Sequence, residues 1–434
     1  MTTLRLLEES SPEFSVELRA LASRGDTDLD RVEPVVREIL SDVRREGDAA
    51  LRRYVQKFEG RSPDTFLVRD YGGKAALESL PQDLRGALET AAQRIDAYHQ
   101  HQKAQLTTFG YEEDEVFLSS RVSPVDRAGI YAPGGKACYP SSVLMSAIPA
   151  KVAGVPEILL ASPDTSVEVR AAAYLSGVTA IVEAGGAQAI AALAYGTESI
   201  PSCDKIVGPG NIYVAAAKRL VFGQVSIDSI AGPSEILVLA DESANPDFVA
   251  ADLLSQAEHD EDAYPLLICT SRAFAERVVS ATLRQLAELP EFDARGRKRR
   301  EIAEASVSRH GTVFIVNSVD RLLELANRLA AEHVSVQMES ASEVAARVTK
   351  AGAIFIGHYT PEAAGDYLAG PSHVLPTGGA ARYGSPLGVY DFVARSSLIR
   401  YEPSALKKQG PAIEVLARAE GLEAHARAVS VRTR

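Results

Sequence analysis

An alternation of short apolar runs with alanine-rich stretches limits the folds open to this chain more than any other feature. It begins near Val122 and continues to about residue 357. The apolar runs are rich in β-branched residues and are typical of buried strands, whereas the stretches between them have helical spacing. Repetition of strand, helix and strand predicts βαβ units, in which helices cover both faces of a parallel sheet. We therefore predict an α/β fold.

The alternation has two halves of similar rhythm. In the first half we expect strands at 128–132, 157–161, 180–183 and 205–207, with helices at 142–153, 166–175, 187–195 and 211–220. In the second half we expect strands at 235–240, 265–270, 312–316 and 353–357, with helices ending near 256 and spanning 272–289, 320–330 and 342–351. The shared rhythm predicts two related open-sheet lobes with a cleft between them.

The bulk properties exclude several classes of protein. A chain of 434 residues is too long for one compact core, so more than one domain is expected. The net charge of −12 argues against a nucleic-acid partner, and the basic run at 290–300 is expected to be a solvated connection. Cys138, Cys203 and Cys269 are scattered singly, which predicts neither a thiolate metal site nor disulfides. Without a signal peptide or a membrane-length apolar run, the sequence predicts a soluble cytoplasmic protein with no membrane partner.

The two flanks of the alternation differ from it. Residues 1–105 are expected to be mostly helical, and the amphipathic stretches 29–60 and 84–105 are expected to pack on something larger. His99 and His101 lie among polar residues and are interpreted as solvated. Residues 402–434 are charged and helical but too thin to hold a core, so we expect them to dock elsewhere, for example on another subunit.

Three glycine-rich turns interrupt the first half, at 131–136, 184–188 and 208–211. Loops that follow the carboxyl ends of parallel strands and lead into helix N-termini favour phosphate-bearing ligands. The usual GxGxxG fingerprint is absent, since Tyr213 stands where its third glycine would be. A tight turn between strand and helix also needs glycine for steric reasons alone. A nucleotide site and a purely structural turn therefore both remain open at this point.

Gln256 and His259 lie three residues apart near the end of a helix that Asn245 and Pro246 are expected to start. Their spacing puts an amide oxygen and an imidazole on one helix face, which supplies part of a metal site. The alternative is a polar helix end that runs into a solvated acidic turn. Asp366 follows a short helical run and, taken alone, is typical of a turn acid.

Two further pairs of residues could carry chemistry. Glu332 and His333 are adjacent where a helix gives way to an extended segment, and together they suit acid–base work near neutral pH. Neighbouring side chains on a strand point in opposite directions, so they can serve one substrate only if the backbone bends there. The alternative is a surface glutamate beside a partly buried histidine. Glu420 and His425 would diverge by about 140° on one helix, but a helix break at Gly421 would let both face one site.

Taken together, several segments resemble one family, the histidinol dehydrogenases, from about residue 20 to the C-terminus. The segments that carry the resemblance are Tyr-Ala-Pro-Gly-Gly-Lys from Tyr131, Gly-Pro-Gly-Asn from Gly208, Ala-Gly-Pro-Ser-Glu from Ala231, Ser-Gln-Ala-Glu-His from Ser255, Ala-Glu-His from Ala331, Ala-Gly-Asp-Tyr from Ala364, Ser-His-Val-Leu-Pro-Thr from Ser372 and the terminal pair of Glu420 and His425. So many motifs in the same order make a chance match very improbable.

The resemblance implies ligands and partners for particular residues. It implies one zinc ion per subunit, bound by Gln256, His259, Asp366 and, from the other subunit of a homodimer, His425. It implies that L-histidinol contacts these four ligands together with Ser234, His333, His373 and Glu420. It implies that NAD contacts Tyr131, Gln188 and Asn211.

The resemblance also implies a fold of two Rossmann-like lobes, related to aldehyde dehydrogenases, with a small, mostly helical C-terminal tail. On this basis we expect residues 1–25 to form an arm and residues 130–234 to form the NAD-binding lobe. Residues 26–129 and 235–380 are expected to form the α/β lobe with the metal and catalytic residues, and residues 381–434 the dimerisation tail.

The resemblance implies a two-step oxidation of L-histidinol to L-histidine through the aldehyde, the last step of histidine biosynthesis. His333 would take the alcohol proton, and Glu332 would activate the water that adds to the aldehyde. Cys138 is a rival nucleophile, although it is equally typical of a small packing residue. Two alternatives stay open: a paralogue that oxidises another polar alcohol, such as a sulfonated diol, and a zinc hydrolase or ligand-binding protein.

Overall fold

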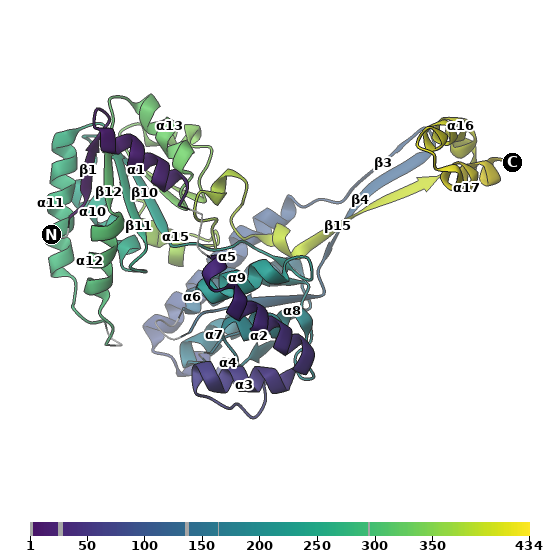
Figure 1. Cartoon of the computed structure of the whole chain (residues 1–434), viewed down its shortest axis with the longest axis horizontal. Helices are drawn as coiled ribbons and strands as arrows, with labels where there is room; N and C mark the ends of the chain where they lie inside the picture. Colours follow the sequence, from purple (N-terminus) through teal and green to yellow (C-terminus); the bar gives the residue numbers. More distant parts are fainter. Residues whose placement is uncertain (1–2, 25–28, 135–138, 164, 294–295) are drawn as a thin grey trace.

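The computed structural model describes residues 3–24, 29–134, 139–163, 165–293 and 296–434. These residues form two lobes, each built on a six-stranded sheet, and a third, three-stranded sheet that leads to the C-terminal helices. Figure 1 shows the two lobes side by side and the third sheet extending away from them. The predicted α/β fold with two open sheets and a helical C-terminal tail is therefore confirmed.

The first lobe contains the sheet with strand order β2-β7-β6-β5-β8-β9, in which every pairing is parallel except that of β2 with β7. Its strands are β2 (Leu67–Val68), β5 (Arg127–Tyr131), β6 (Glu157–Ala161), β7 (Ala180–Val182), β8 (Lys205–Val207) and β9 (Ser226–Ile227). One face is covered by α2 (Glu33–Glu46), α3 (Asp48–Glu59), α8 (Gly186–Tyr195) and α9 (Ile212–Val221). The other face is covered by α4 (Gly73–Ser79), α5 (Gln82–Ala104), α6 (Pro140–Ala153) and α7 (Val167–Ser176).

The second lobe contains an entirely parallel sheet with strand order β1-β12-β11-β10-β13-β14. Its strands are β1 (Arg5–Glu8), β10 (Glu235–Ala240), β11 (Tyr264–Cys269), β12 (Thr312–Ile315), β13 (His333–Gln337) and β14 (Ala353–Ile356). One face packs on α1 (Pro12–Ala22), α13 (Val319–Leu329) and α14 (Ala341–Arg347). The other packs on α10 (Pro246–Ala257), α11 (Arg272–Glu288) and α12 (Arg299–His310), and the short α15 (Glu362–Tyr367) contacts α10.

The C-terminal tail extends from an antiparallel sheet of β3 (Phe109–Glu113), β4 (Val116–Pro124) and β15 (Val393–Tyr401). It ends in α16 (Pro403–Ala419) and α17 (Glu423–Thr433), which pack on each other. Figure 1 shows both helices at the far end of the sheet, away from the two lobes. Short 3₁₀ turns occur at Leu29–Arg31, Ala380–Arg382 and Val389–Phe392.

The packing of the N-terminal third differs from the expected division of the chain. Residues 1–25 were expected to form a separate arm, but β1 pairs with β12 inside the second sheet and α1 packs on α13. Residues 26–129 were expected in the second lobe, but α2 to α5 belong to the hydrophobic clusters of the first lobe, where α2 and α3 pack on α8, α4 on α7 and α5 on α6. The physical reason is that an amphipathic helix pattern shows that a face must be buried but does not specify the surface that buries it.

One smaller expectation also fails, for a residue that is more buried than the sequence indicated. His99 is completely buried in α5 instead of solvated. None of the described residues of the basic run is buried, as expected for a solvated connection, and within it Arg297 and Arg299 both bind Asp293. Cys138, the rival nucleophile, lies outside the described residues. Within the described ranges, no helix has both the length and the apolar composition that a membrane crossing requires.

Candidate active site

The candidate catalytic residues lie at the amino-terminal edge of the second sheet. His333 is the first residue of β13, and Glu332 directly precedes it. The chain leaves α13 through Ala330, which has a left-handed conformation with φ of 46° and ψ of 56°. Glu332 Oε2 lies 3.6 Å from His333 Nδ1, so the two neighbouring side chains approach each other. Both are almost completely buried.

His333 is held in one protonation form by its surroundings. Its Nδ1 lies 2.9 Å from the backbone carbonyl oxygen of Glu235. Because a carbonyl oxygen can only accept, Nδ1 carries the hydrogen, and Nε2 is left with the basic lone pair. Burial lowers the pKa of His333 to about 4, so the ring is neutral near pH 7. A neutral imidazole with a free Nε2 is suited to accept a proton from a substrate.

Glu332 is connected to Glu235 at the start of β10. The backbone N–H of Glu235 donates to Glu332 Oε2 at 2.9 Å, and the backbone N–H of Glu332 donates to Glu235 Oε2 at 3.2 Å. Burial raises the pKa of Glu332 well above its ordinary value, and the neighbouring carboxylate of Glu235 adds to the rise. Such a carboxyl can exchange a proton at a pH where an exposed glutamate is already ionised.

Beside this pair, the structure brings together three of the four predicted metal ligands. Gln256 is in the last turn of α10, and its Nε2 lies 3.4 Å from His259 Nδ1. His259 Nε2 in turn lies 3.9 Å from Asp366 Oδ2 in α15. His373, predicted to contact substrate, has its Nδ1 3.7 Å from Asp366 Oδ1. Burial lowers the pKa of His373, so its ring is also neutral near pH 7.

The donor set here fits a divalent cation. Gln256 is completely buried, and within the described residues its side-chain oxygen has no hydrogen-bond partner. A buried amide oxygen without a partner costs free energy unless something else occupies it. With one imidazole and one carboxylate beside it, this oxygen belongs to an oxygen- and nitrogen-rich set of the kind that zinc accepts.

Glu362 is a member of the site that sequence reasoning missed. Its Oε1 lies 3.6 Å from His333 Nε2, and its Oε2 accepts a hydrogen bond from Ser255 at 3.1 Å. His333, Glu362 and Asp366 each offer one atom to a group that fits within 4.8 Å. Burial, followed by the charge of Asp366, raises the pKa of Glu362 to about 8. The available signal was its spacing of four residues from Asp366, which puts both on one helix face.

The three predicted cofactor contacts lie at the carboxyl edge of the first sheet. Tyr131 ends β5, and its hydroxyl accepts a hydrogen bond at 3.0 Å from the backbone N–H of Gly186, at the start of α8. Gln188 lies in the first turn of α8, buried, with its Nε2 3.3 Å from Glu59. Asn211 caps α9 by accepting from the backbone N–H groups of Tyr213 and Val214. Two helix N-termini therefore meet at this edge, which favours an anionic ligand.

The turn after β8 is held very close to β5. A Cβ added to Gly208 would lie 2.1 Å from the carbonyl oxygen of Tyr131, and its φ of +115° also favours glycine. Lys218 donates to the carbonyl oxygen of Gly208 at 3.0 Å and forms a buried ion pair with Asp228. Asp228 accepts from the backbone N–H of Gly208 at 2.8 Å. This turn is therefore fixed by buried contacts, as a preformed binding loop requires.

The two groups of residues are linked where the lobes meet. His373 Nε2 lies 3.3 Å from the hydroxyl of Ser142 in α6 of the first lobe. The neighbouring Ser372 donates to the carbonyl oxygen of Met145, in the same helix, at 3.2 Å. Ser234, a predicted substrate contact, is partly buried and directly precedes Glu235. The candidate site therefore lies at the contact between the carboxyl edge of the first sheet and the amino edge of the second.

Glu420 and His425 are not brought to this site by their own chain. Glu420 ends α16, Gly421 breaks the helix with φ of 75°, and His425 lies in the first turn of α17. Both side chains are exposed, and Figure 1 places these helices away from the two lobes. The predicted helix break is present, but completion of the site by these residues requires a second chain.

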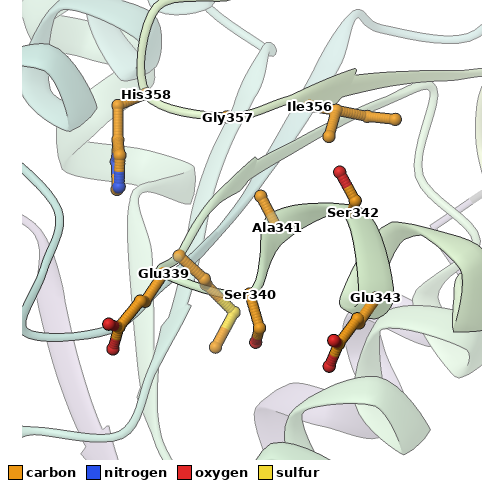
Figure 2. A pocket seen from close by; sticks show the side chains of 9 residues that line it. Glu339, Ser340, Ala341, Ser342, Glu343, Ile356, Gly357 and His358 are labelled. Carbon is orange, nitrogen blue, oxygen red and sulfur yellow. The ribbon is translucent and has the colours of Figure 1, made fainter.

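A pocket of about 390 Å³ lies at the opposite edge of the second sheet. It is lined by residues 338–343 and 356–358, which follow the carboxyl ends of β13 and β14. Figure 2 shows Glu339 and His358 on two sides of this pocket. Because His333 begins β13 and this pocket follows its end, the pocket is separate from the candidate active site.

The chain is similar to known proteins along almost its whole length. The family model described as histidinol dehydrogenase matches residues 22–433. The histidinol dehydrogenase of Neisseria meningitidis serogroup A is 48% identical over 99% of this chain and 100% of the relative. That of Syntrophotalea carbinolica is 49% identical over 99% of both chains. The crystal structure of the Elizabethkingia anophelis histidinol dehydrogenase superposes with a TM-score of 0.90, at 35% identity, over 99% of this chain and 98% of that one.

Proposed function

The chain belongs to the histidinol dehydrogenase family, and from that premise we propose that it oxidises L-histidinol to L-histidine with NAD and zinc, in the cytoplasm. The observation that carries this proposal is the buried pair of Glu332 and His333 beside Gln256, His259 and Asp366. The match to the histidinol dehydrogenase family model does not favour the alternatives, which are the oxidation of another polar alcohol, a zinc hydrolase and a ligand-binding protein.

We propose that Gln256, His259 and Asp366 of one subunit bind zinc together with His425 of the partner subunit. Support comes from the unpartnered side-chain oxygen of Gln256 and from the mixed oxygen and nitrogen donors around it. Bound to these residues, the ion would supply a Lewis-acidic centre for nitrogen atoms of the substrate. The proposed substrate contacts of this chain are the metal ligands, His333, Ser234 and His373, with Glu420 of the partner subunit.

We propose that NAD binds at the carboxyl edge of the first sheet, against Tyr131, Gln188 and Asn211. The helix N-termini of α8 and α9 favour its pyrophosphate, and the tight turn at Gly208 lets the backbone approach closely. When bound, the nicotinamide ring supplies the hydride acceptor. This way of binding NAD needs no GxGxxG fingerprint, because here the glycines of a different turn let the backbone approach the cofactor closely.

Conversion of an alcohol to a carboxylic acid removes two hydrides, and water must add between the two removals. His333 Nε2 accepts the proton of the alcohol oxygen in the first oxidation. Glu332, once ionised, accepts a proton from the water that adds to the aldehyde carbon. As the water adds, His333 returns its proton to the former aldehyde oxygen, and it then accepts a hydroxyl proton of the resulting hydrate in the second oxidation. General acid–base assistance of this kind contributes about 10²- to 10⁴-fold.

We propose that two chains form a homodimer through the tail. The tail exposes large apolar side chains, among them Val415 and Leu416, each 67% exposed, and Val431, 58% exposed. Exposed apolar side chains gathered on an extended element are typical of a surface that another protein covers. A second copy would cover them and would bring Glu420 and His425 to the site that lacks them.

The direct test measures nicotinamide reduction by absorbance after purified protein receives NAD and a limiting amount of L-histidinol. The proposal predicts about two NADH for each histidinol, with no accumulation of free aldehyde, as a two-step oxidation requires. Absence of NADH formation with histidinol would overturn the proposal. A yield of one NADH with released aldehyde would overturn the two-step reaction.

A further inference from the structure

Glu235 contacts both catalytic residues through its backbone, and it also contacts Glu332 through its side chain. Its backbone N–H donates to the carboxyl of Glu332 at 2.9 Å, and its carbonyl oxygen accepts from Nδ1 of His333 at 2.9 Å. Its carboxylate accepts from the backbone N–H groups of Glu332, at 3.2 Å, and Gly378, at 2.7 Å. Glu235 therefore contributes to holding both catalytic side chains in place.

Arg24 is the only cation that forms an ion pair with Glu235 in the described part of the chain, and it comes from the N-terminal segment. Its Nε and Nη2 donate to the two carboxylate oxygens of Glu235 at 2.7 and 2.5 Å, a two-pronged contact. It also donates to the carbonyl oxygens of Leu21, at 2.6 Å, and Leu329, at 2.9 Å. Leu329 ends α13, immediately before the turn that leads to Glu332.

Because the ion pair of Arg24 and Glu235 is buried, removal of either charge is expected to disturb the site. Both side chains are 1% exposed, so neither charge can be solvated by water if the other is removed. Without Arg24, the carboxylate of Glu235 would be an unpaired buried charge next to the carboxyl of Glu332. It would have to take up a proton or turn away, and either change would weaken the bonds that orient the catalytic residues.

We propose that Arg24 and Glu235 are positioning residues that hold Glu332 and His333 in the geometry that catalysis requires. The N-terminal segment thereby contributes to the active site. This inference rests on the proposed function, because it takes the chemical roles of Glu332 and His333 from there. Neither residue touches the reacting atoms. Arg24 fixes Glu235, and Glu235 orients the Glu332 carboxyl and the imidazole of His333.

The competing explanation is that the pair only anchors the N-terminal segment to the second lobe. Arg5 provides a matched control, because it anchors the same segment through an ion pair with Glu17 at 2.6 Å and a bond to Thr312 at 3.1 Å. It does not contact Glu235, Glu332 or His333 in the described structure. An effect of Arg24→Met that Arg5→Met does not produce is therefore an effect on the site.

The experiment compares Arg24→Met, Arg5→Met and the double variant Arg24→Met/Glu235→Gln by steady-state kinetics on full-length enzyme. We expect Arg24→Met to lower kcat for histidinol about 100-fold, the usual effect of a small misplacement, with KM unchanged. The double variant removes both charges together, so it should fold stably and still show the kcat loss. Wild-type kcat in the folded double variant, or equal losses in Arg24→Met and Arg5→Met, would overturn the proposal.

A measurement without substrate separates this inference from the proposed function. Spectra of protein labelled with ¹⁵N-histidine report the tautomer of each ring, and His333→Asn identifies the signal of His333 among the 8 histidines. We expect a single Nδ1–H tautomer for His333 in the wild type and in Arg5→Met, and a mixture of tautomers in the double variant. An unchanged tautomer in the double variant would overturn the positioning role, even if the wild type failed to oxidise histidinol.

Discussion

Burial sets the charge of the two residues proposed to carry the reaction. It lowers the pKa of His333 to about 4 and raises the pKa of Glu332 well above its ordinary value. At neutral pH the imidazole is therefore a ready base, whereas Glu332 keeps its proton to a higher pH than an exposed glutamate and can activate water only in its ionised form. A positive charge near Asp366 would favour that ionised form. The two side chains thus differ in the conditions under which each can act.

The separate roles proposed for His333 and Glu332 predict that variants of the two residues lose different steps of the reaction. His333→Asn should lower the rate of both alcohol and aldehyde oxidation, by about 10²- to 10⁴-fold, because the base acts in both. Glu332→Gln should leave alcohol oxidation near the wild-type rate and strongly slow aldehyde oxidation. Single-turnover assays started separately with histidinol and with its aldehyde measure each step. Equal losses in the two steps for Glu332→Gln would contradict the assigned roles.

The burial of His99 predicts that the free energy of unfolding depends on pH, independently of catalysis. Its Nδ1 contacts the Ile95 carbonyl oxygen at 2.8 Å, and burial lowers the pKa of His99 below its ordinary value of 6.5. The unfolded chain therefore binds a proton more readily than the folded chain, so stability falls as the pH drops below about 6.5. Denaturant titrations between pH 7 and 5 should show a smaller loss for His99→Gln than for the wild type.

The control for this experiment is His101→Gln, because that side chain is exposed on the same helix. It should lose stability with falling pH as the wild type does. If His99→Gln and the wild type had parallel pH profiles, the buried ring would not be a source of acid sensitivity.

At the scale of secondary-structure elements, Asp252 connects the three elements that carry residues of the site, which are α10, β13 and α15. It lies on α10, one turn before Gln256. Its Oδ2 accepts from Gln337 at 2.8 Å and from Ser335 at 3.4 Å on β13, and its carboxyl also accepts the backbone N–H of Glu362 at the start of α15. Burial raises the pKa of Asp252 to about 6, so these donors surround a carboxyl that is still ionised near pH 7.

We predict that Asp252→Ala weakens zinc binding about 10- to 100-fold, the usual effect of losing a residue that supports metal ligands. The reason is that α15, which carries Asp366, loses its bond to α10, which carries Gln256. Competition with a chromogenic chelator measures the affinity. Asp247→Ala, on the exposed side of the same helix, is the control and should bind zinc normally. An equal affinity in the wild type and Asp252→Ala would contradict this connection.

The sequence predicted the buried elements better than the exposed ones. The strands at 157–161, 205–207 and 235–240 have the predicted bounds, because buried parallel strands are continuous apolar runs between turns. Strand β3 was missed, since every one of its residues is exposed and no apolar pattern marks it. Long-range packing was also beyond the pattern, which is why α2 to α5 were placed on the wrong lobe.

The same distinction applies to the site. Gln256 and His259 were found because they share a helix face, and Asp366 came only from the resemblance. Arg24, Glu235 and Glu362 were missed, because a charged residue in a sequence is usually at the surface and only the fold shows that these are buried. The contribution of Glu420 and His425 cannot follow from the pattern of one chain, since a second chain would have to supply it.

At the scale of the whole molecule, the two lobes present opposite edges of their sheets to one site. The first lobe offers the carboxyl edge with Tyr131 and Asn211, and the second offers the amino edge with His333. Contacts of His373 and Ser372 with α6 connect the two edges. The tail carries α17, and with it His425, away from this junction, so the proposed set of zinc ligands is incomplete within one chain.

A heterodimer of two inactive variants tests this most directly. His333→Asn and His425→Ala, co-expressed with different tags and purified through both, give dimers that contain one chain of each kind. If each site combines His333 of one chain with His425 of the other, one of the two sites is intact, and the heterodimer should regain about half of the wild-type activity. If the heterodimer is as inactive as the two parent variants, His425 does not act across the subunits, and the account of a shared site is wrong.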